Sequence, residues 1–273
     1  MSYDVLVIGG GPAGLSAAVN VRARGKSVLV VSNPMTESAL WKAEQVDNHL
    51  GMPGMTGRAM LETFHRHALD AGAEVREGKV LTAMAMGDQW YVTIGSDMEQ
   101  ASALVLTAGV SRGKKFPGEA EFLGRGVSYC ATCDGMLDRG KKVAVAGYTD
   151  TARREAEFLS GIGCDVTYLD KPRDLTVSGE VKVSSVTADG RTLEVEALFL
   201  LRPTVAPTDL FPGLEVENNY VAVNRKMETN LPGLFAAGDC TGGPLQVSKA
   251  VGEGLIAGQS AAIYAGKVNA SKA

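Results

Sequence analysis

The stretch "YDVLVIGGGPAGLSAAVNVRARGKSVLVVS", residues 3–32, predicts the βαβ unit from which the fold is built. Residues 3–8 form the short apolar run of a buried strand, and residues 15–24 repeat apolar positions at helical spacing. A second apolar run, residues 26–32, predicts a strand parallel to the first. We therefore expect an α/β protein that begins with a nucleotide-binding type of unit.

The turn between the first strand and the helix has the pattern G-x-G-x-x-G. Glycine there lets the backbone approach a pyrophosphate, and the helix N-terminus supplies N–H donors. The alternative is a tight structural turn, and Ser32-Asn33 stands where an acid for the ribose hydroxyls is usual. We predict that the turn binds a dinucleotide through Gly9, Gly11, Pro12, Ala13 and Gly14.

Composition limits the function further. The chain has 273 residues, 45% of them hydrophobic and 21% charged, which suits one large or two modest globular domains. A net charge of -4 argues against a nucleic-acid partner or an anionic membrane surface. No positive segment or long apolar run precedes the glycine turn, so we expect no signal peptide or membrane anchor and a cytoplasmic protein.

Two cysteines in "SYCATCDGM", residues 128–136, form a C-x-x-C pair with an acid directly after it. In a reducing compartment such a pair is more often catalytic or metal-binding than structural. A structural zinc needs four ligands, and the other cysteines and histidines are isolated in the sequence: Cys164, Cys240, His49, His65 and His67. We predict a redox-active pair at Cys130 and Cys133, no metal site, and core positions for the two other cysteines.

Near the C-terminus, "NLPGLFAAGDC" (residues 230–240) predicts a turn, a short apolar strand and a Gly-Asp turn. With this motif, four short motifs occur in a fixed order: "IGGGPAG" (8–14), "LVLTAGV" (104–110), "CATCDG" (130–135) and "AAGDC" (236–240). Over nearly its whole length the sequence resembles the low-molecular-weight thioredoxin reductases, flavoproteins with two dinucleotide-binding domains.

The resemblance implies a fold and a cofactor. The fold is α/β, with two Rossmann-like domains of the FAD/NAD(P)-binding type, the second inserted in the first and reduced in size. The implied boundaries are 1–113 and 208–273 for the FAD domain and 114–207 for the inserted domain. The first fingerprint would hold FAD, and further contacts would come from Asn48, Ala108, Gly109, Gly238, Asp239 and Gln246. Thr107, Ala108 and Gly109 would form the turn by which the chain leaves the FAD domain. For Asn48 and Gln246 the alternative is an ordinary polar residue of a loop or helix end.

The resemblance also implies roles around the cysteine pair. Cys133 would exchange electrons with the flavin, and Cys130 would take part in interchange with the disulfide of a thioredoxin-like protein. Asp134 would protonate a leaving thiolate, or cap the following helix, or both. Which cysteine attacks the external disulfide stays open, and the family implies a homodimer.

A second βαβ unit, residues 141–170, has lost the glycines of its turn. On the same spacing Gly147 holds the first glycine position, but Thr149 and Ala152 hold the others, and Tyr148 adds bulk. A side chain at the second position works against close approach of a pyrophosphate.

The 2′-phosphate site is missing as well. Asp170-Lys171-Pro172 replaces the basic cluster with which the family's NADPH-using members hold that phosphate, and an aspartate would repel it. Beyond it, alternating residues with an Asp189-Gly190 turn predict strands and a hairpin. We therefore expect no nicotinamide donor.

The chain thus resembles the pyridine-nucleotide-independent branch, in which ferredoxin or a second flavin supplies electrons. FAD could then number two per chain, and Trp41 could stack on a cofactor or belong to the core. A short basic set could steer an acidic carrier or be a solvated face: Arg112, Lys114, Lys115, Arg139, Lys141 and Lys142. Two other hypotheses remain, a divergent NADPH-dependent reductase and a flavin-containing redox sensor.

Overall fold

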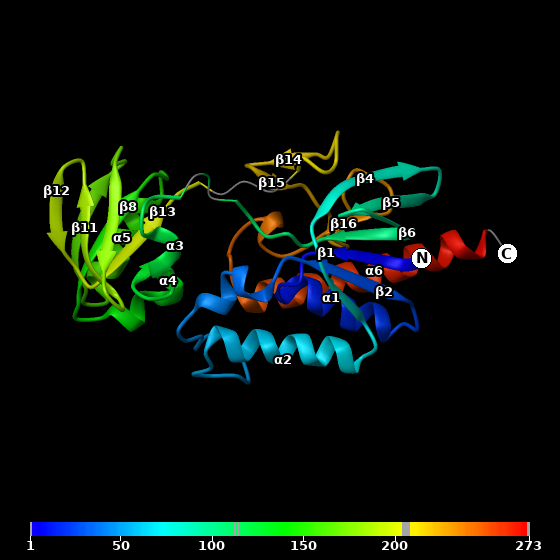
Figure 1. Cartoon of the computed structure of the whole chain (residues 1–273), viewed down its shortest axis with the longest axis horizontal. Coiled ribbons are helices and arrows are strands. Elements are labelled where there is room, and N and C mark those ends of the chain that lie inside the picture. The colour runs from blue at the N-terminus through cyan, green and yellow to red at the C-terminus, as the bar shows by residue number, and fades with distance from the viewer. Residues whose placement is uncertain (1, 112, 114, 204–207, 272–273) are drawn as a thin grey trace. The chain divides into compact units, whose positions relative to one another are not determined.

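The computed structural model describes residues 2–111, 113, 115–203 and 208–271. It divides the chain into two compact units (Figure 1). The first comprises Met1–Trp41, Gln45–Ser111 and Val205–Ala273, and the second comprises Lys42–Glu44 and Arg112–Thr204. The expected domain junctions include residue 114 and residues 204–207, which lie outside the described residues, as do Arg112 and Lys114 of the basic set.

The first unit is built on a seven-stranded sheet of order β3-β2-β1-β6-β5-β4, with β16 paired to β6. Its parallel part consists of β1 (Ser2–Ile8), β2 (Val28–Ser32), β3 (Glu74–Glu77), β6 (Asp97–Leu106) and β16 (Leu234–Ala236). The antiparallel strands β4 (Val80–Met86) and β5 (Gln89–Ile94) extend it through β6. The central strands are buried on both faces, which is why they appear in the sequence as continuous apolar runs.

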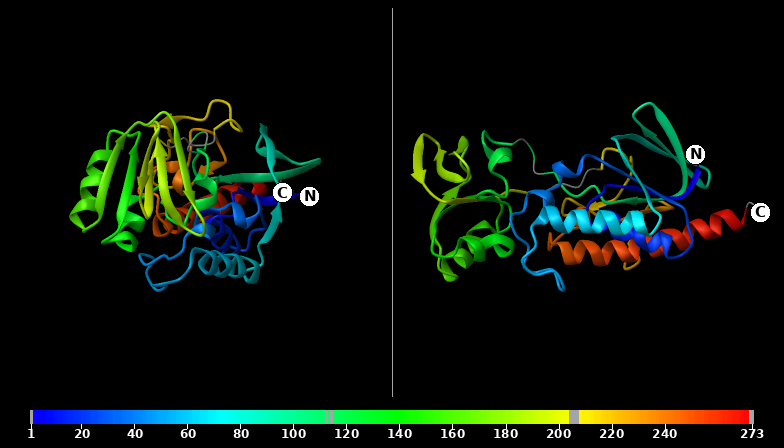
Figure 2. Two further views of the ribbon diagram at one scale, coloured as in Figure 1. Left: turned by 60° about the vertical axis from the view of Figure 1, so that its left-hand side comes forward. Right: turned by 60° about the horizontal axis from the view of Figure 1, so that its bottom comes forward.

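Three helices pack against one face of this sheet: α1 (Pro12–Arg22), α2 (Gly57–Asp70) and α6 (Val247–Ala270) (Figure 2). The helices α1 and α6 approach closely because α6 carries glycine at the contact. A Cβ at Gly254 or Gly258 would run into the backbone of Ala13 or Ala17. On the other face, β4, β5 and the hairpin of β14 (Val216–Glu217) and β15 (Tyr220–Val221) cover a second apolar core.

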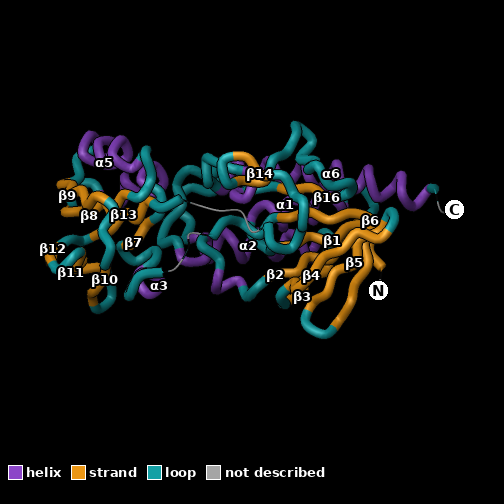
Figure 3. Tube along the Cα trace, turned by 90° about the horizontal axis from the view of Figure 1, so that it is seen from above, coloured by secondary structure: helices purple, strands orange, loops and turns teal. Residues whose placement is uncertain are grey.

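The second unit has a parallel sheet of order β7-β13-β8-β9 between two layers (Figure 3). Its strands are β7 (Val127–Ser128), β8 (Lys142–Gly147), β9 (Asp165–Asp170) and β13 (Ala197–Leu201). The helix α5 (Ala152–Gly161) covers one face, and the antiparallel strands β10 (Leu175–Gly179), β11 (Val183–Ala188) and β12 (Arg191–Glu194) cover the other. The short helices are α3 (Glu119–Phe122), α4 (Ala131–Asp134) and the 3₁₀ turn Gly135–Asp138.

The structure confirms the α/β class with a Rossmann-like sheet and both expected βαβ units. The first helix ends at Arg22 and the second strand begins at Val28, two residues inside the expected bounds. The Asp189-Gly190 hairpin turn is also present, with φ of +47° and +81° joining β11 to β12. Among the described helices, none combines the length and the apolar character needed to cross a bilayer.

Candidate active site

The glycines of the first turn have different reasons to be there. Gly9 has a φ of +117°, and a Cβ on it would meet the carbonyl of Thr107; a Cβ on Gly14 would collide with the carbonyl of Gly9. Gly9 is therefore needed for its backbone conformation and its packing, and Gly14 for its packing. Gly11, by contrast, has a φ of -80° and forms the N-cap of α1, and its Cβ would meet nothing within 4 Å. The open space that only Gly11 leaves, at the N-terminus of α1, is where a pyrophosphate would fit.

Three turns meet at the carboxyl edge of the sheet in the first unit. The parallel register aligns Ile8 with Leu106 and Leu106 with Ala236, so the residues that follow β1, β6 and β16 lie at one edge. These residues include the sequence-predicted ones: Gly9, Gly11, Pro12, Ala13 and Gly14, then Ala108 and Gly109, then Gly238 and Asp239. A Cβ on Gly238 (φ +86°) would lie 2.8 Å from that of Ala13, so the Gly-Asp turn adjoins the start of α1.

The structure also brings together the two polar residues chosen from distant motifs. The Asn48 side-chain amide donates a hydrogen bond of 3.1 Å to the side-chain oxygen of Gln246, which is the N-cap residue of α6. Beside this pair, His49 Nδ1 lies 3.1 Å from the Ser248 hydroxyl. The loop that carries Asn48 is thereby fixed to the start of α6.

Trp41 belongs to the packed part of the first unit. Its ring is partly buried against the core that α1, α2 and α6 form, and the Arg58 guanidinium lies 5.0 Å from the ring centroid.

Near the end of β2, where the G-x-G-x-x-G unit lacks its usual acid, the Asn33 side-chain amide donates a hydrogen bond of 3.0 Å to the Glu37 carboxylate. Glu37 is an acid near this edge that sequence reasoning missed, because it comes four residues after the usual position.

In the second unit Cys130 and Cys133 form a disulfide, with their Cα atoms 5.3 Å apart. Cys130 is the N-cap residue of α4, and its sulfur accepts a hydrogen bond of 3.2 Å from the Cys133 backbone N–H. The predicted pairing of the two cysteines is therefore present in the structure.

Ser128 connects the Cys130 backbone to Asp134. Its hydroxyl donates a 2.5 Å hydrogen bond to Asp134 Oδ2 and accepts one of 3.1 Å from the Cys130 N–H. Burial raises the pKa of the Asp134 carboxyl above its usual value, and Asp138 adds to this while the Ser128 hydrogen bond opposes it. Asp134 is the N-cap residue of the following 3₁₀ turn, but its side chain makes no capping hydrogen bond there. Sequence reasoning missed Ser128, although it lies two residues before the pair.

The degenerate turn after β8 is filled by its own side chain. The Tyr148 hydroxyl donates 2.7 Å to the Pro172 carbonyl and so bridges the ends of β8 and β9. Its ring stacks on Phe116, with centroids 6.1 Å apart and planes at 24°. Burial raises the pKa of Tyr148 to about 12, so the phenol stays protonated as a donor. The aromatic ring thus stands at the strand edge where a nucleotide-binding turn would need open backbone.

The remaining thiols lie in hydrophobic cores, as the sequence predicts. Burial raises the pKa of both thiols, that of Cys240 to about 12, which leaves them protonated.

Across the described residues there is no group of three or more His, Cys, Asp or Glu arranged to hold a metal. Of the basic set, Lys141 pairs with Asp138 at 2.8 Å.

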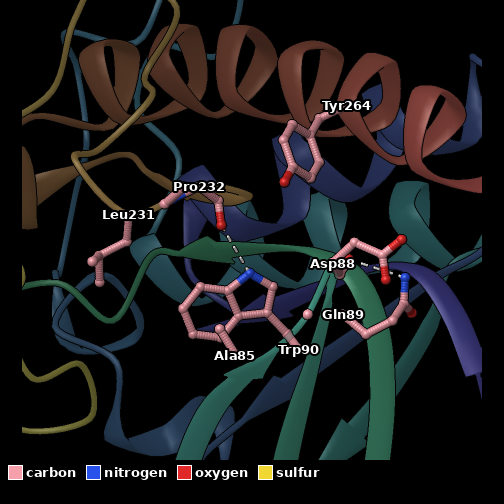
Figure 4. Close-up of a pocket in the computed structure, with 8 residues that line it drawn as sticks. Ala85, Asp88, Gln89, Trp90, Leu231, Pro232 and Tyr264 are labelled. Atoms are coloured by element: carbon pink, nitrogen blue, oxygen red, sulfur yellow. Dashed lines mark hydrogen bonds between the residues drawn. The ribbon is translucent and has the colours of Figure 1, made fainter.

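A small pocket of about 130 Å³ lies between β4, β5 and α6 (Figure 4). The Trp90 indole donates 3.3 Å to the Pro232 carbonyl at its wall, and Tyr264 of α6 closes one side. Pro232 precedes β16 while the Gly-Asp turn follows it, so the pocket lies at the opposite edge of the sheet from the dinucleotide turn. It contains none of the predicted site residues.

Comparison with known proteins places the chain among disulfide reductases. The family model "Pyridine nucleotide-disulphide oxidoreductase" matches residues 3–178 and 170–254. Thioredoxin reductase of Bacillus subtilis is 31% identical, over 96% of this chain and 94% of that protein. A ferredoxin-flavin thioredoxin reductase of Clostridium acetobutylicum is 35% identical, with a TM-score of 0.63 and 99% of both chains covered.

A third protein supports the fold alone. The thioredoxin reductase of Streptococcus pyogenes is 24% identical and has a TM-score of 0.87 over 97% of this chain and 99% of that one. From the family match, the relatives and the paired cysteines, we conclude that this chain belongs to the pyridine nucleotide-disulphide oxidoreductase family and is a thioredoxin reductase-like, flavin-dependent oxidoreductase.

Proposed function

We propose that this protein reduces the disulfide of a thioredoxin-like protein through one bound FAD and the Cys130–Cys133 pair. The observation that carries the proposal is the Cys130–Cys133 disulfide beside a buried acid, Asp134, with Ser128 hydrogen-bonded both to the Cys130 backbone N–H and to the Asp134 carboxylate. The FAD domain would comprise residues 1–113 and 208–273, and residues 114–207 would be inserted in it.

The first unit fits FAD on its own geometry. We call the open space beside Gly11, at the N-terminus of α1, the cradle. The backbone N–H groups of the first turn of α1 face it, and the Gly238-Asp239 turn adjoins it. The residues that would hold the cofactor are Gly9, Gly11, Pro12, Ala13, Gly14, Asn48, Ala108, Gly109, Gly238, Asp239 and Gln246. Nothing in the described part of the chain supports a second flavin, so we propose one per chain.

Bound FAD would supply the two electrons that cleave the Cys130–Cys133 bond and, with two protons, leave two thiols. The Cys130 thiol then loses its proton to water, and the thiolate attacks one sulfur of the partner disulfide, forms a mixed disulfide and displaces the partner's other sulfur as a thiolate. Asp134, whose pKa is raised, gives that leaving thiolate its proton. Cys133 attacks the mixed disulfide, which restores the Cys130–Cys133 bond and releases the second partner thiol.

We propose ferredoxin rather than a nicotinamide as the electron donor. Tyr148 fills the turn that would receive the dinucleotide, and Asp170 stands where a cation for the 2′-phosphate would be needed. The relative from Clostridium acetobutylicum that shares 35% identity is by name a ferredoxin-flavin thioredoxin reductase. Two reduced ferredoxins, each a one-electron donor, would balance the reduction of one disulfide.

Anaerobic stopped-flow mixing tests the donor. The holoprotein with oxidised thioredoxin is mixed with reduced ferredoxin in one run and with NADPH in another, and flavin absorbance and partner thiols are followed. We expect ferredoxin to sustain repeated turnover and NADPH to leave the flavin oxidised. Rapid bleaching by micromolar NADPH would show an NADPH-dependent reductase. A single stoichiometric reduction with ferredoxin, without turnover, would indicate a redox sensor instead.

A further inference from the structure

Two charged residues one turn apart on α6, Lys249 and Glu253, both reach the turn that follows β16. The Lys249 ammonium donates to the carbonyls of Gly238 (2.7 Å) and Gly242 (2.6 Å). It also lies 2.9 Å from the Thr241 hydroxyl oxygen. An ammonium has three donors, and each of these contacts falls on the five-residue turn 238–242.

The Glu253 carboxylate holds the same turn by accepting hydrogen bonds from the turn's N–H and hydroxyl groups. One oxygen, Oε2, accepts from the Gly238 N–H at 2.9 Å and from the Thr241 hydroxyl at 2.7 Å. The same oxygen lies 3.0 Å from Lys249 Nζ, and the two side chains are only 20% and 16% exposed. Low exposure makes these charge-assisted hydrogen bonds stronger than their surface equivalents.

The turn needs such support because its backbone is unusual. Gly238 and Gly242 have φ of +86° and +116°, conformations open mainly to glycine, and glycine loses the most freedom on folding. Between them lie Asp239, Cys240 and Thr241 in a single 3₁₀ turn. The sheet holds the start of the turn, where the Ala237 N–H donates 3.0 Å to the Leu106 carbonyl, while Lys249 and Glu253 tie its two ends to a long helix.

We infer that Lys249 and Glu253 are positioning residues for the flavin: they hold the Gly238–Gly242 turn in the shape that receives the FAD ribityl and pyrophosphate groups. The inference rests on the proposed binding of FAD at this edge. It assigns the pair no contact with FAD; both act through the turn. Because α6 also packs along α1 at Ala13, the pair sets the turn relative to the helix N-terminus that bounds the cradle.

The first test removes the hydrogen bonds one side at a time and measures the FAD dissociation constant of the apoprotein. Lys249→Met removes the ammonium that donates to the Gly238 and Gly242 carbonyls, and Glu253→Ala removes the carboxylate that accepts from the Gly238 N–H. We expect each variant to bind FAD at least tenfold more weakly, which equals about 1.4 kcal/mol. Lys267→Met is the matched control, since Lys267 is an exposed lysine in the last turn of the same helix.

A conservative variant separates position from charge. Glu253→Gln removes the negative charge but keeps an oxygen that accepts from the Gly238 N–H. If Glu253 acts only by holding the turn in place, this variant should bind FAD within about threefold of the wild-type affinity. A charge effect on the FAD phosphates would instead make Glu253→Ala and Glu253→Gln alike. The double variant K249M/E253A, which leaves no unpaired buried charge, should keep the apoprotein melting temperature near wild type and still bind FAD weakly.

The outcomes are distinct. Equal FAD affinity in Lys249→Met and Lys267→Met would overturn the inference, as would equal weakness of Glu253→Gln and Glu253→Ala. If the double variant loses FAD affinity only together with the melting temperature of its apoprotein, the pair is a fold-stabilising pair and the inference is wrong. A wild-type protein that neither contains nor takes up FAD would instead refute the proposed function.

Discussion

The Ser128 hydroxyl donates a hydrogen bond of 2.5 Å to the Asp134 carboxylate, six residues along the chain and on the other side of the disulfide. The interaction lowers the pKa of Asp134, while burial, the larger effect, raises it. Ser128 therefore limits how far burial raises the pKa of the proposed acid, although its hydroxyl takes no part in electron transfer.

Ser128→Ala should move the pH profile of turnover. If Asp134 acts as an acid, turnover falls as pH rises through its raised pKa. The substitution removes the hydrogen bond that favours the carboxylate, so that pKa rises further and the falling limb moves to higher pH. The measurement is kcat/KM for thioredoxin reduction across pH, with Ser184→Ala, an exposed serine on β11, as control. An unmoved limb would remove Asp134 from the proton-transfer role.

The same pair should make stability depend on pH. A carboxyl whose pKa is raised on folding holds its proton more tightly in the folded state. Its contribution to the free energy of unfolding is therefore complete below its pKa in the unfolded chain and is lost as the pH rises through its pKa in the folded protein. In Ser128→Ala the ionised form also loses a hydrogen bond of about 1.5–3 kcal/mol. Urea unfolding should therefore show a larger destabilisation of this variant at pH values above the folded pKa of Asp134 than below its unfolded pKa.

Cys133→Ser should leave FAD bound and stop electron passage to the partner. The remaining Cys130 thiol can form a mixed disulfide but cannot close the ring that releases it. FAD content and thioredoxin thiols after anaerobic photoreduction are the measurements. Cys164→Ser, which changes a buried thiol outside the pair, should retain turnover. Sustained turnover in Cys133→Ser would contradict the assignment.

Two glycine substitutions in the same turn should affect different properties: one should weaken FAD binding, and the other should destabilise the fold. In Gly11→Ala the new Cβ enters open space with an ordinary φ, so the apoprotein should melt near the wild-type temperature while FAD binds at least tenfold more weakly, about 1.4 kcal/mol. In Gly14→Ala the Cβ strikes the Gly9 carbonyl, and the fold should lose about 1–3 kcal/mol. Melting of the apoproteins and FAD titration check both. Full FAD content in Gly11→Ala would show that the cradle is misassigned.

Restoring the second fingerprint should create only weak nicotinamide binding. We expect the variant with Tyr148→Gly, Thr149→Gly, Asp170→His, Lys171→Arg and Pro172→Arg to bind NADPH without efficient turnover, because hydride transfer also needs close approach of the reacting atoms. The control keeps Tyr148 and carries the other four changes; it should not bind, since the ring still fills the turn. NADPH-dependent melting shifts report binding. A micromolar response of the wild-type protein would mean that a nicotinamide site survives.

The sequence alone determined the elements whose signals are local. Strand β1, the glycine turn and α1 follow from apolar periodicity and from a spacing that only a strand-turn-helix unit satisfies. The pairing of Cys130 with Cys133 follows in the same way, since two residues of separation bring the sulfurs together in one helical turn. Such features depend on neighbours along the chain, and the chain itself supplies them.

Only the tertiary structure decided which distant groups meet. Asn48 and Gln246 are joined by folding, and nothing in either motif shows their hydrogen bond. The hold of Lys249 and Glu253 on the Gly238 turn was likewise invisible, because a Lys and a Glu four apart on a helix usually form an exposed pair. The sequence showed that Tyr148 spoils a glycine turn, but its contacts with Phe116 and Pro172 join three segments, of which only the ends of β8 and β9 are brought together by parallel pairing. Each of these contacts joins residues that are brought together by packing, and packing is a property of the whole folded chain.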